Sequence, residues 1–271
     1  MYDTINFQEL FEGFQNTPLL WNASDIYGFE QFCPEHTTKP FYQNSEIKKL
    51  RLGKWVENFV AFQLENQEDI TIIEENLLIK EEKRTIGELD ILLINQNQPI
   101  HLEVVYKFYL YDNSNTYNDP LAYWIGPSRN DTLVYKLNKL KDKQFPLLHH
   151  PKTLETLKKY QFDINTIKQR VCFNAQLFLP YQNQDIDVSP LNTDCVAGWY
   201  LNIERINELE SFQFYIPEKL QWLCAPKETV DWLSFIEAKN EIKTFIANRQ
   251  SPLCWLRNEH GEFQKCFITW W

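Results

Sequence analysis

Two acidic residues lie in a stretch of sequence that otherwise has the character of a buried strand. Apolar residues dominate Gly87–Ile94, and the two-residue period of a strand places Glu88, Asp90, Leu92 and Ile94 on one face. A carboxylate on a buried face needs a compensating partner, because burial of an unpaired charge is costly. The chain must therefore adopt a fold that compensates acids near the centre of a sheet.

The next strand-like stretch carries a further acid and a lysine. Ile100–Leu110 follows the short polar turn 95–99, so we expect the two stretches to form a hairpin. The same two-residue period aligns Glu103 with Lys107. If the register places Asp90 opposite Glu103, two like charges so close together indicate a cation between them.

A divalent metal ion suits such a place. Mg²⁺, or Mn²⁺ in its place, takes one or two carboxylates and leaves positions for water and a substrate phosphate. A metal ion there can orient water and stabilise the charge that develops in phosphodiester cleavage. Glu57 lies in the inward stripe of a helix predicted over 47–65, and we expect it to support the ligands Asp90 and Glu103.

A basic segment interrupts an acidic chain. The formal charge of -10 argues against a general polyanion binder but does not exclude a local basic groove. The helix predicted over 130–144 carries lysines on one stripe that could follow a phosphate backbone, although a solvated helix face is the alternative. The candidate contacts for a DNA or RNA substrate are Arg129, Lys136, Lys139, Lys143 and Gln144.

Composition argues against several classes of protein. No stretch approaches the roughly 18 apolar residues of a membrane span, and the N-terminus lacks the features of a signal peptide. We therefore expect a cytoplasmic protein that does not enter a membrane. The six cysteines include no CxxC pair, which indicates reduced and mostly buried thiols rather than a disulfide framework or a structural zinc site.

The pattern of elements predicts three parts along the chain. These are an aromatic segment over 1–45 packed on a core, an α/β core over 46–185 and an α+β subdomain over 186–271. Besides the hairpin, we predict strands at 69–73, 77–81, 171–179, 195–203, 212–216 and 219–224, a helix over 228–247 and a C-terminal hairpin of 253–257 with 263–270.

The acids and their order resemble the PD-(D/E)XK nuclease superfamily, through Gly87-Glu-Leu-Asp90 and His101-Leu-Glu103. The resemblance implies a restriction-endonuclease-like core, with a mixed central sheet flanked by helices. It also implies that Asp90 and Glu103 are metal ligands, with Glu57 and Lys107 as further catalytic residues. The pattern departs at Val105, which stands where the superfamily has its lysine. Lys107 lies about 13 Å from Glu103 along an extended strand.

A second resemblance is to a bacterial family described as domain of unknown function 1853. It rests on five short motifs, which are Gly-Glu-Leu-Asp at 87–90, His-Leu-Glu at 101–103, Lys-Phe-Tyr-Leu at 107–110, Trp-Ile-Gly-Pro at 124–127 and Lys-Gln-Phe-Pro-Leu at 143–147. Weaker likeness extends to 195–199 and to the tryptophan-rich C-terminus.

These patterns together predict a Mg²⁺-dependent phosphodiesterase that acts on DNA or RNA. One alternative is a catalytically inactive member of the same fold, which binds nucleic acid or a protein partner through the basic helix or the aromatic C-terminal region. Another is an adaptor that binds only proteins. A separate alternative makes Glu103 and Lys107 a buried ion pair that holds the hairpin together.

Overall fold

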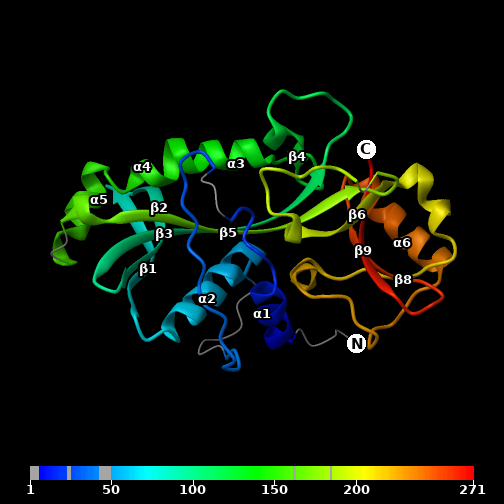
Figure 1. Ribbon diagram of the computed structural model, residues 1–271, viewed down its shortest axis with the longest axis horizontal. Helices are drawn as coiled ribbons and strands as arrows, with labels where there is room; N and C mark the ends of the chain where they lie inside the picture. Colours follow the sequence, from blue (N-terminus) through cyan, green and yellow to red (C-terminus); the bar gives the residue numbers. More distant parts are fainter. Residues whose placement is uncertain (1–5, 23–25, 43–49, 161–162, 184) are drawn as a thin grey trace. The chain divides into compact units, whose positions relative to one another are not determined.

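The computed structural model describes residues 6–22, 26–42, 50–160, 163–183 and 185–271 (Figure 1). The chain forms two compact units, each assembled from segments that are distant in sequence. The carboxylate unit consists of 19–106 and 135–174. The C-terminal unit consists of 1–18, 107–134 and 175–271. The sequence predicts boundaries near 45 and 185, which would separate consecutive segments of the chain. These boundaries stay predictions.

The carboxylate unit is built on strands in the order β1-β2-β3-β5. Their bounds are β1 Ile70–Glu81, β2 Arg84–Asn95, β3 Gln98–Tyr111 and β5 Lys168–Pro180, of which β3 and β5 begin in this unit. The predicted hairpin of β2 and β3 is confirmed, and Gln96 and Asn97 make its turn with positive φ angles of 47° and 71°. The strands predicted at 69–73 and 77–81 are a single strand, β1, with two register shifts against β2.

Helices cover the strands of this unit. They are α2 Leu52–Glu65, α3 Leu133–Lys139, the π-helix η2 Leu140–Gln144, α4 Phe145–Leu147 and α5 Pro151–Leu157, with short 3-10 turns η3 Lys158–Tyr160 and η4 Ile164–Thr166. Figure 1 shows α2 on one side of β1 to β3, and α4 and α5 on the other. Leu148 and Leu157 pack with Ile79 and Leu89 of the strands. The first part of the helix predicted over 47–65 lies outside the described residues.

The C-terminal unit contains the ends of β3 and β5 and the strand order β5-β6-β9-β8-β7, with β4 paired to β3. Its elements are α1 Phe7–Gln15, η1 Pro120–Tyr123, β4 Trp124–Ile125, η5 Thr193–Cys195, β6 Val196–Asn202, η6 Ile203–Leu209, β7 Gln213–Tyr215, η7 Lys219–Leu223, α6 Phe235–Ala247, β8 Leu253–Arg257 and β9 Phe263–Thr269. Parallel pairs β5–β6 and β6–β9 join antiparallel pairs β8–β9 and β7–β8. The fold is therefore mixed α/β, with a large mixed sheet and flanking helices.

Two predictions for this unit fail for reasons of helix capping. The strand predicted at 219–224 is the 3-10 helix η7, whose capping box joins Glu218 and Gln221. The helix predicted over 228–247 begins only at Phe235, because Ser234 and Glu237 form a capping box there. The C-terminal hairpin of β8 and β9 is confirmed.

Two expectations from composition can be compared with the structure. The structure describes all six cysteines and places none of them in a disulfide; five of them are buried, as predicted. Within the part of the chain that the structure describes, no helix combines the length and the apolar character needed to span a bilayer.

Gly198 tests the packing of the parallel strands β6 and β9. A Cβ atom at Gly198 would overlap the backbone carbonyl of Lys265 on β9, which cannot move aside as a side chain can. We expect Gly198→Ala to lower the free energy of unfolding by roughly 1–3 kcal/mol in chemical denaturation. Gly53→Ala on α2 is the control, because its Cβ meets no atom within 4 Å and alanine favours the helix. Equal stability of the two variants would contradict the packing.

Candidate metal and catalytic site

The register of β2 and β3 places Asp90 opposite Glu103. The ladder ends at the pair of Ile91 with Leu102, so the positions that follow in the same register are Asp90 and Glu103. Asp90 Oδ2 accepts a hydrogen bond from the backbone N–H of Val104 at 2.9 Å. The acids therefore lie beside each other at the end of this ladder. There the Asp90 side chain, and not the β2 backbone, accepts the hydrogen bond from the β3 backbone.

Glu103 is fully buried and is held by a histidine on its own strand. Gln169 Nε2 lies 2.8 Å from the carbonyl of Phe145 and 3.1 Å from His101 Nδ1, so it donates to both. Since Nδ1 accepts, the proton of the neutral ring is on Nε2, which donates to Glu103 Oε1 at 3.1 Å. Burial lowers the pKa of His101 to about 4, which keeps the ring neutral.

A π-helical turn supplies the second partner of Glu103. Gln144 Nε2 donates to Glu103 Oε2, while Gln144 Oε1 accepts from Lys136 Nζ at 2.7 Å. Residues eight apart diverge by about 80° in a regular helix of 3.6 residues per turn. The wider turn of η2, Leu140–Gln144, brings Gln144 back toward the face of Lys136.

Three carboxylates form an acidic cluster, and Asp90 belongs both to this cluster and to the pair with Glu103. Glu57 of α2 and Glu88 and Asp90 of β2 each offer an oxygen, and these oxygens lie within 4.8 Å of one another. The ammonium group of Lys54 contacts this cluster, with Nζ 2.7 Å from Glu57 Oε2 and 2.9 Å from Glu88 Oε1. Lys54 Nζ also donates to Asn76 Oδ1, and Asn76 has a positive φ of 55°. A lysine cation therefore already neutralises part of the cluster.

Burial is the largest influence on the ionisation of these acids. It raises the pKa of Asp90 to about 7, with the charge of Glu103 adding to the effect. Burial also raises the pKa of Glu103, against the opposing charge of Lys136. Burial raises the pKa of Glu57, although the hydrogen bond from Lys54 acts in the other direction. For Lys54, the bonds to Glu57 and Glu88 outweigh burial and raise the pKa.

Hard oxygen donors of this kind fit a divalent cation. Glu57, Glu88 and Asp90 offer carboxylate oxygens that lie together, whereas Glu103 on the neighbouring strand is not part of that group. Such ligands suit Mg²⁺ and Mn²⁺, which prefer carboxylate and water oxygen. A buried acid whose pKa is raised without a cation is also an acid that a cation would stabilise in its charged form.

The structure distributes the other predicted residues over both units. Lys136 and Gln144 take part in the carboxylate site, while Lys139 and Lys143 are exposed on the same helical segment. The predicted lysine stripe changes direction at η2, because a π turn advances the helix by a smaller angle per residue.

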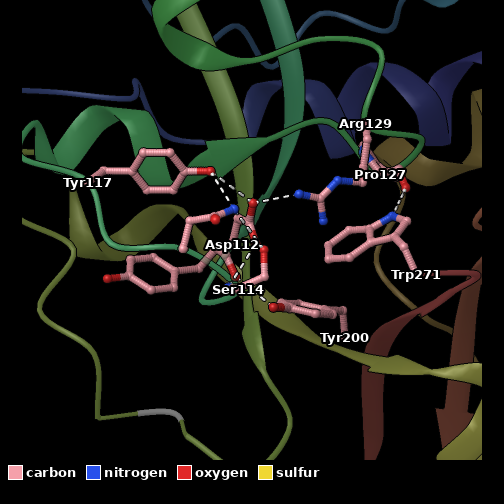
Figure 2. Close-up of polar contacts among 9 residues, drawn as sticks. Asp112, Ser114, Tyr117, Pro127, Arg129, Tyr200 and Trp271 are labelled. Carbon is pink, nitrogen blue, oxygen red and sulfur yellow. Dashed lines mark hydrogen bonds and ion pairs between the residues drawn. The ribbon is translucent and has the colours of Figure 1, made fainter.

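Lys107 and Arg129 belong to the C-terminal unit and have acidic partners there. Lys107 Nζ contacts Asp131 Oδ2, so the partner that the structure gives Lys107 is Asp131 and not Glu103. Arg129 Nη2 donates to Asp112 at 2.7 Å (Figure 2).

Sequence reasoning missed Lys54, Asn76 and Gln169 as parts of the site. Lys54 lies three residues before Glu57 on α2, a spacing that places the two side chains together on a helix. That spacing was the available signal for Lys54. Asn76 and Gln169 are defined only by strand register and by the packing of α4, which no local pattern indicates.

The fold and the site define a mixed α/β protein with a buried carboxylate pair and an adjoining acidic cluster. Over residues 35–268 the chain matches the family described as "Domain of unknown function (DUF1853)", and it belongs to that family. Neither the curated proteins nor the solved structures contain a significant match to it.

The raised pKa of Asp90 predicts how stability depends on pH when no metal is added. Folded Asp90 keeps its proton up to about pH 7, whereas an unfolded aspartate loses it near pH 3.9. The folded state binds more protons in this interval, so Asp90 should make the free energy of unfolding fall as pH rises through it, by at most about 1.4 kcal/mol per unit for this one group.

Asp90→Asn should flatten this fall, since asparagine keeps an acceptor for the Val104 N–H but does not titrate. Denaturation between pH 4.5 and 7.5 with a chelator, about the interval that the shift defines, measures the effect. The control Asp142→Asn changes an exposed acid and should follow the wild type. Parallel curves for Asp90→Asn and wild type would show that Asp90 does not titrate as described.

Proposed function

We propose that the chain is a metal-dependent phosphodiesterase, a nuclease of the PD-(D/E)XK type that acts on DNA or RNA. The observation that carries the proposal is the position of Asp90 and Glu103 just beyond the last pair of the β2–β3 ladder, with Glu57 and Glu88 clustered around Asp90. Acids on a first helix and on two adjacent strands are the arrangement that the resemblance to this superfamily implies.

In this proposal Asp90 and Glu103 bind Mg²⁺ or Mn²⁺, and Glu57 and Glu88 adjoin the ligands. The metal supplies Lewis-acid stabilisation of a phosphate oxygen when bound. His101 and Gln144 fix the two oxygens of Glu103 by hydrogen bonds, so its carboxylate is held in one orientation.

Lys54 takes the role of charge stabilisation that the sequence suggested for Lys107. Its ammonium group lies within 3 Å of Glu57 and Glu88, whereas Lys107 is paired with Asp131. Lys136 adds a second positive charge through Gln144. Both lysines would act on charge that develops on a phosphate near the carboxylates.

A catalytically inactive module that binds nucleic acid or a protein is the second candidate. Two observations favour it: Val105 replaces the lysine of active nucleases, and Lys54 already supplies a cation to Glu57 and Glu88. A lysine that satisfies the acids removes part of the need for a metal ion.

Calorimetry and a cleavage assay on the same variants separate the two candidates. We expect the wild type to bind Mn²⁺ and to cleave DNA or RNA, and Asp90→Asn to lose both, because asparagine removes the ligand charge but keeps the acceptor for the Val104 N–H. Lys54→Met should keep metal binding but lower cleavage by about 10²- to 10³-fold, by analogy with loss of one stabilising donor.

Lys152→Met is the matched control, since Lys152 and Glu155 form an i,i+3 pair like Lys54 and Glu57. It should leave metal binding and cleavage unchanged. A wild type that neither binds metal nor cleaves single- or double-stranded DNA or RNA would overturn the enzyme. Metal binding that appears only in Lys54→Met would support the inactive module.

The exposed Lys139 tests nucleic-acid binding by the helical segment that carries Gln144. If Lys139 contacts a phosphate, Lys139→Gln should weaken binding equally for all sequences and reduce the salt dependence by about one counterion. Fluorescence titration at several salt concentrations measures both. Lys83→Gln, an exposed lysine between β1 and β2, is the control. Identical salt slopes for the two variants would make Lys139 ordinary solvated surface.

A further inference from the structure

Two adjacent hollows lie in the C-terminal unit, away from the carboxylates in sequence. One is a cavity of about 540 Å³ whose wall includes Trp222 and Phe245, and the other measures about 560 Å³ and is lined by Arg129 and Arg249. Both share Ser128 and Gln250 in their walls. Each volume is in the range of about 300–1,000 Å³ found for small-molecule sites.

The polar hollow is bordered by two arginine–tryptophan contacts. The guanidinium carbon of Arg129 is 4.5 Å from the ring centre of Trp271, and that of Arg249 is 5.7 Å from the ring centre of Trp270. Arg129 also bonds Asp112, as Figure 2 shows with Trp271 alongside. Asp112 compensates one of the two positive charges, so the arginine pair keeps a net positive charge toward the hollow.

Both arginines occupy backbone positions that favour glycine. Arg129 has φ 57° in the turn where its N–H bonds the carbonyl of Gly126, and Arg249 has φ 54° directly after the C-cap of α6. The N–H of Gln250 bonds the carbonyl of Phe245, which closes a Schellman motif around Arg249. A side chain in this conformation is strained, and such strain persists where the side chain serves another purpose.

The other hollow has aromatic walls, and a hydroxyl without a partner is buried in its lining. Trp222, Phe245 and Pro217 provide flat apolar walls, and Glu241 adds a carboxylate. Ser251 lines the same hollow and is 4% exposed, and its hydroxyl has no hydrogen-bond partner among the described residues. A buried hydroxyl without a partner is costly, so a ligand that bonds it would gain affinity.

We propose that these hollows form one site for a mononucleotide. The base lies against Trp222 and Phe245, where Ser251 and Glu241 bond its edge, and the phosphate lies against Arg249 and Arg129. Base stacking on aromatic rings and bidentate binding of phosphate by arginine are the interactions that such a ligand uses. The site is separate from the carboxylate site, and its occupancy does not depend on phosphodiester cleavage.

Calorimetry with AMP, GMP, CMP, UMP and inorganic phosphate tests this site in the full chain. At least one nucleotide should bind more tightly than phosphate. Arg249→Gly should weaken nucleotide binding by about 10- to 100-fold, the loss of one charged hydrogen-bonding group, while the melting temperature rises because glycine relieves the strained φ. Ser251→Ala should weaken the binding of nucleotides and leave the binding of inorganic phosphate unchanged.

Arg205→Gln is the control, because Arg205 is paired with Glu208 outside both hollows and should leave binding unchanged. Three results would overturn the proposal. They are no nucleotide binding to the wild type at millimolar concentration, binding that is insensitive to both Arg249→Gly and Ser251→Ala, and binding of phosphate alone. None of these depends on whether the carboxylate site binds metal or cleaves nucleic acid.

Discussion

The burial of Asp90 beside Glu103 is the constraint on which the rest of the carboxylate unit depends. Two carboxylates in a low-dielectric interior lose their hydration and repel each other. The loss of hydration is the largest cause of the raised pKa of each acid. Neighbouring groups offset this cost by donating hydrogen bonds to each acid. Asp90 receives a backbone N–H, and Glu103 receives donors from His101 and Gln144. A polar network so fully satisfied fixes the end of the hairpin.

Lys54 makes the same site suitable for two different uses. Its ammonium group and a divalent cation would compete for the oxygens of Glu57 and Glu88, because both are compact positive charges that take several oxygen donors. The hydrogen bonds to Asp90 and Glu103 come from Val104, His101 and Gln144. A metal ion that used the remaining lone pairs of these two carboxylates would therefore not need to displace Lys54. The balance between these arrangements decides whether the site supports phosphodiester chemistry or only a stable fold.

The C-terminal unit presents a different chemistry, in which strain and stacking replace buried acids. Arg129 and Arg249 occupy left-handed backbone positions and extend over the two terminal tryptophans. Glycine would relieve both positions, so the guanidinium groups are retained at a cost in stability. The unpartnered hydroxyl of Ser251 represents a similar cost nearby. These features share a cause if the hollows between them bind a ligand that carries both a planar ring and an anion.

The sequence by itself determined the elements whose signals are local. The two-residue period placed Asp90 and Glu103 on faces that the register brings together, and a polar turn and the C-terminal pattern predicted both hairpins. Only the tertiary structure decided the contacts of Lys54 with Glu88 and of Gln144 with Glu103, which are 34 and 41 residues apart. Periodicity reports which face a side chain occupies, because it depends on backbone geometry alone. Which distant side chain meets it depends on helix packing, and here on a π turn that no local preference specifies.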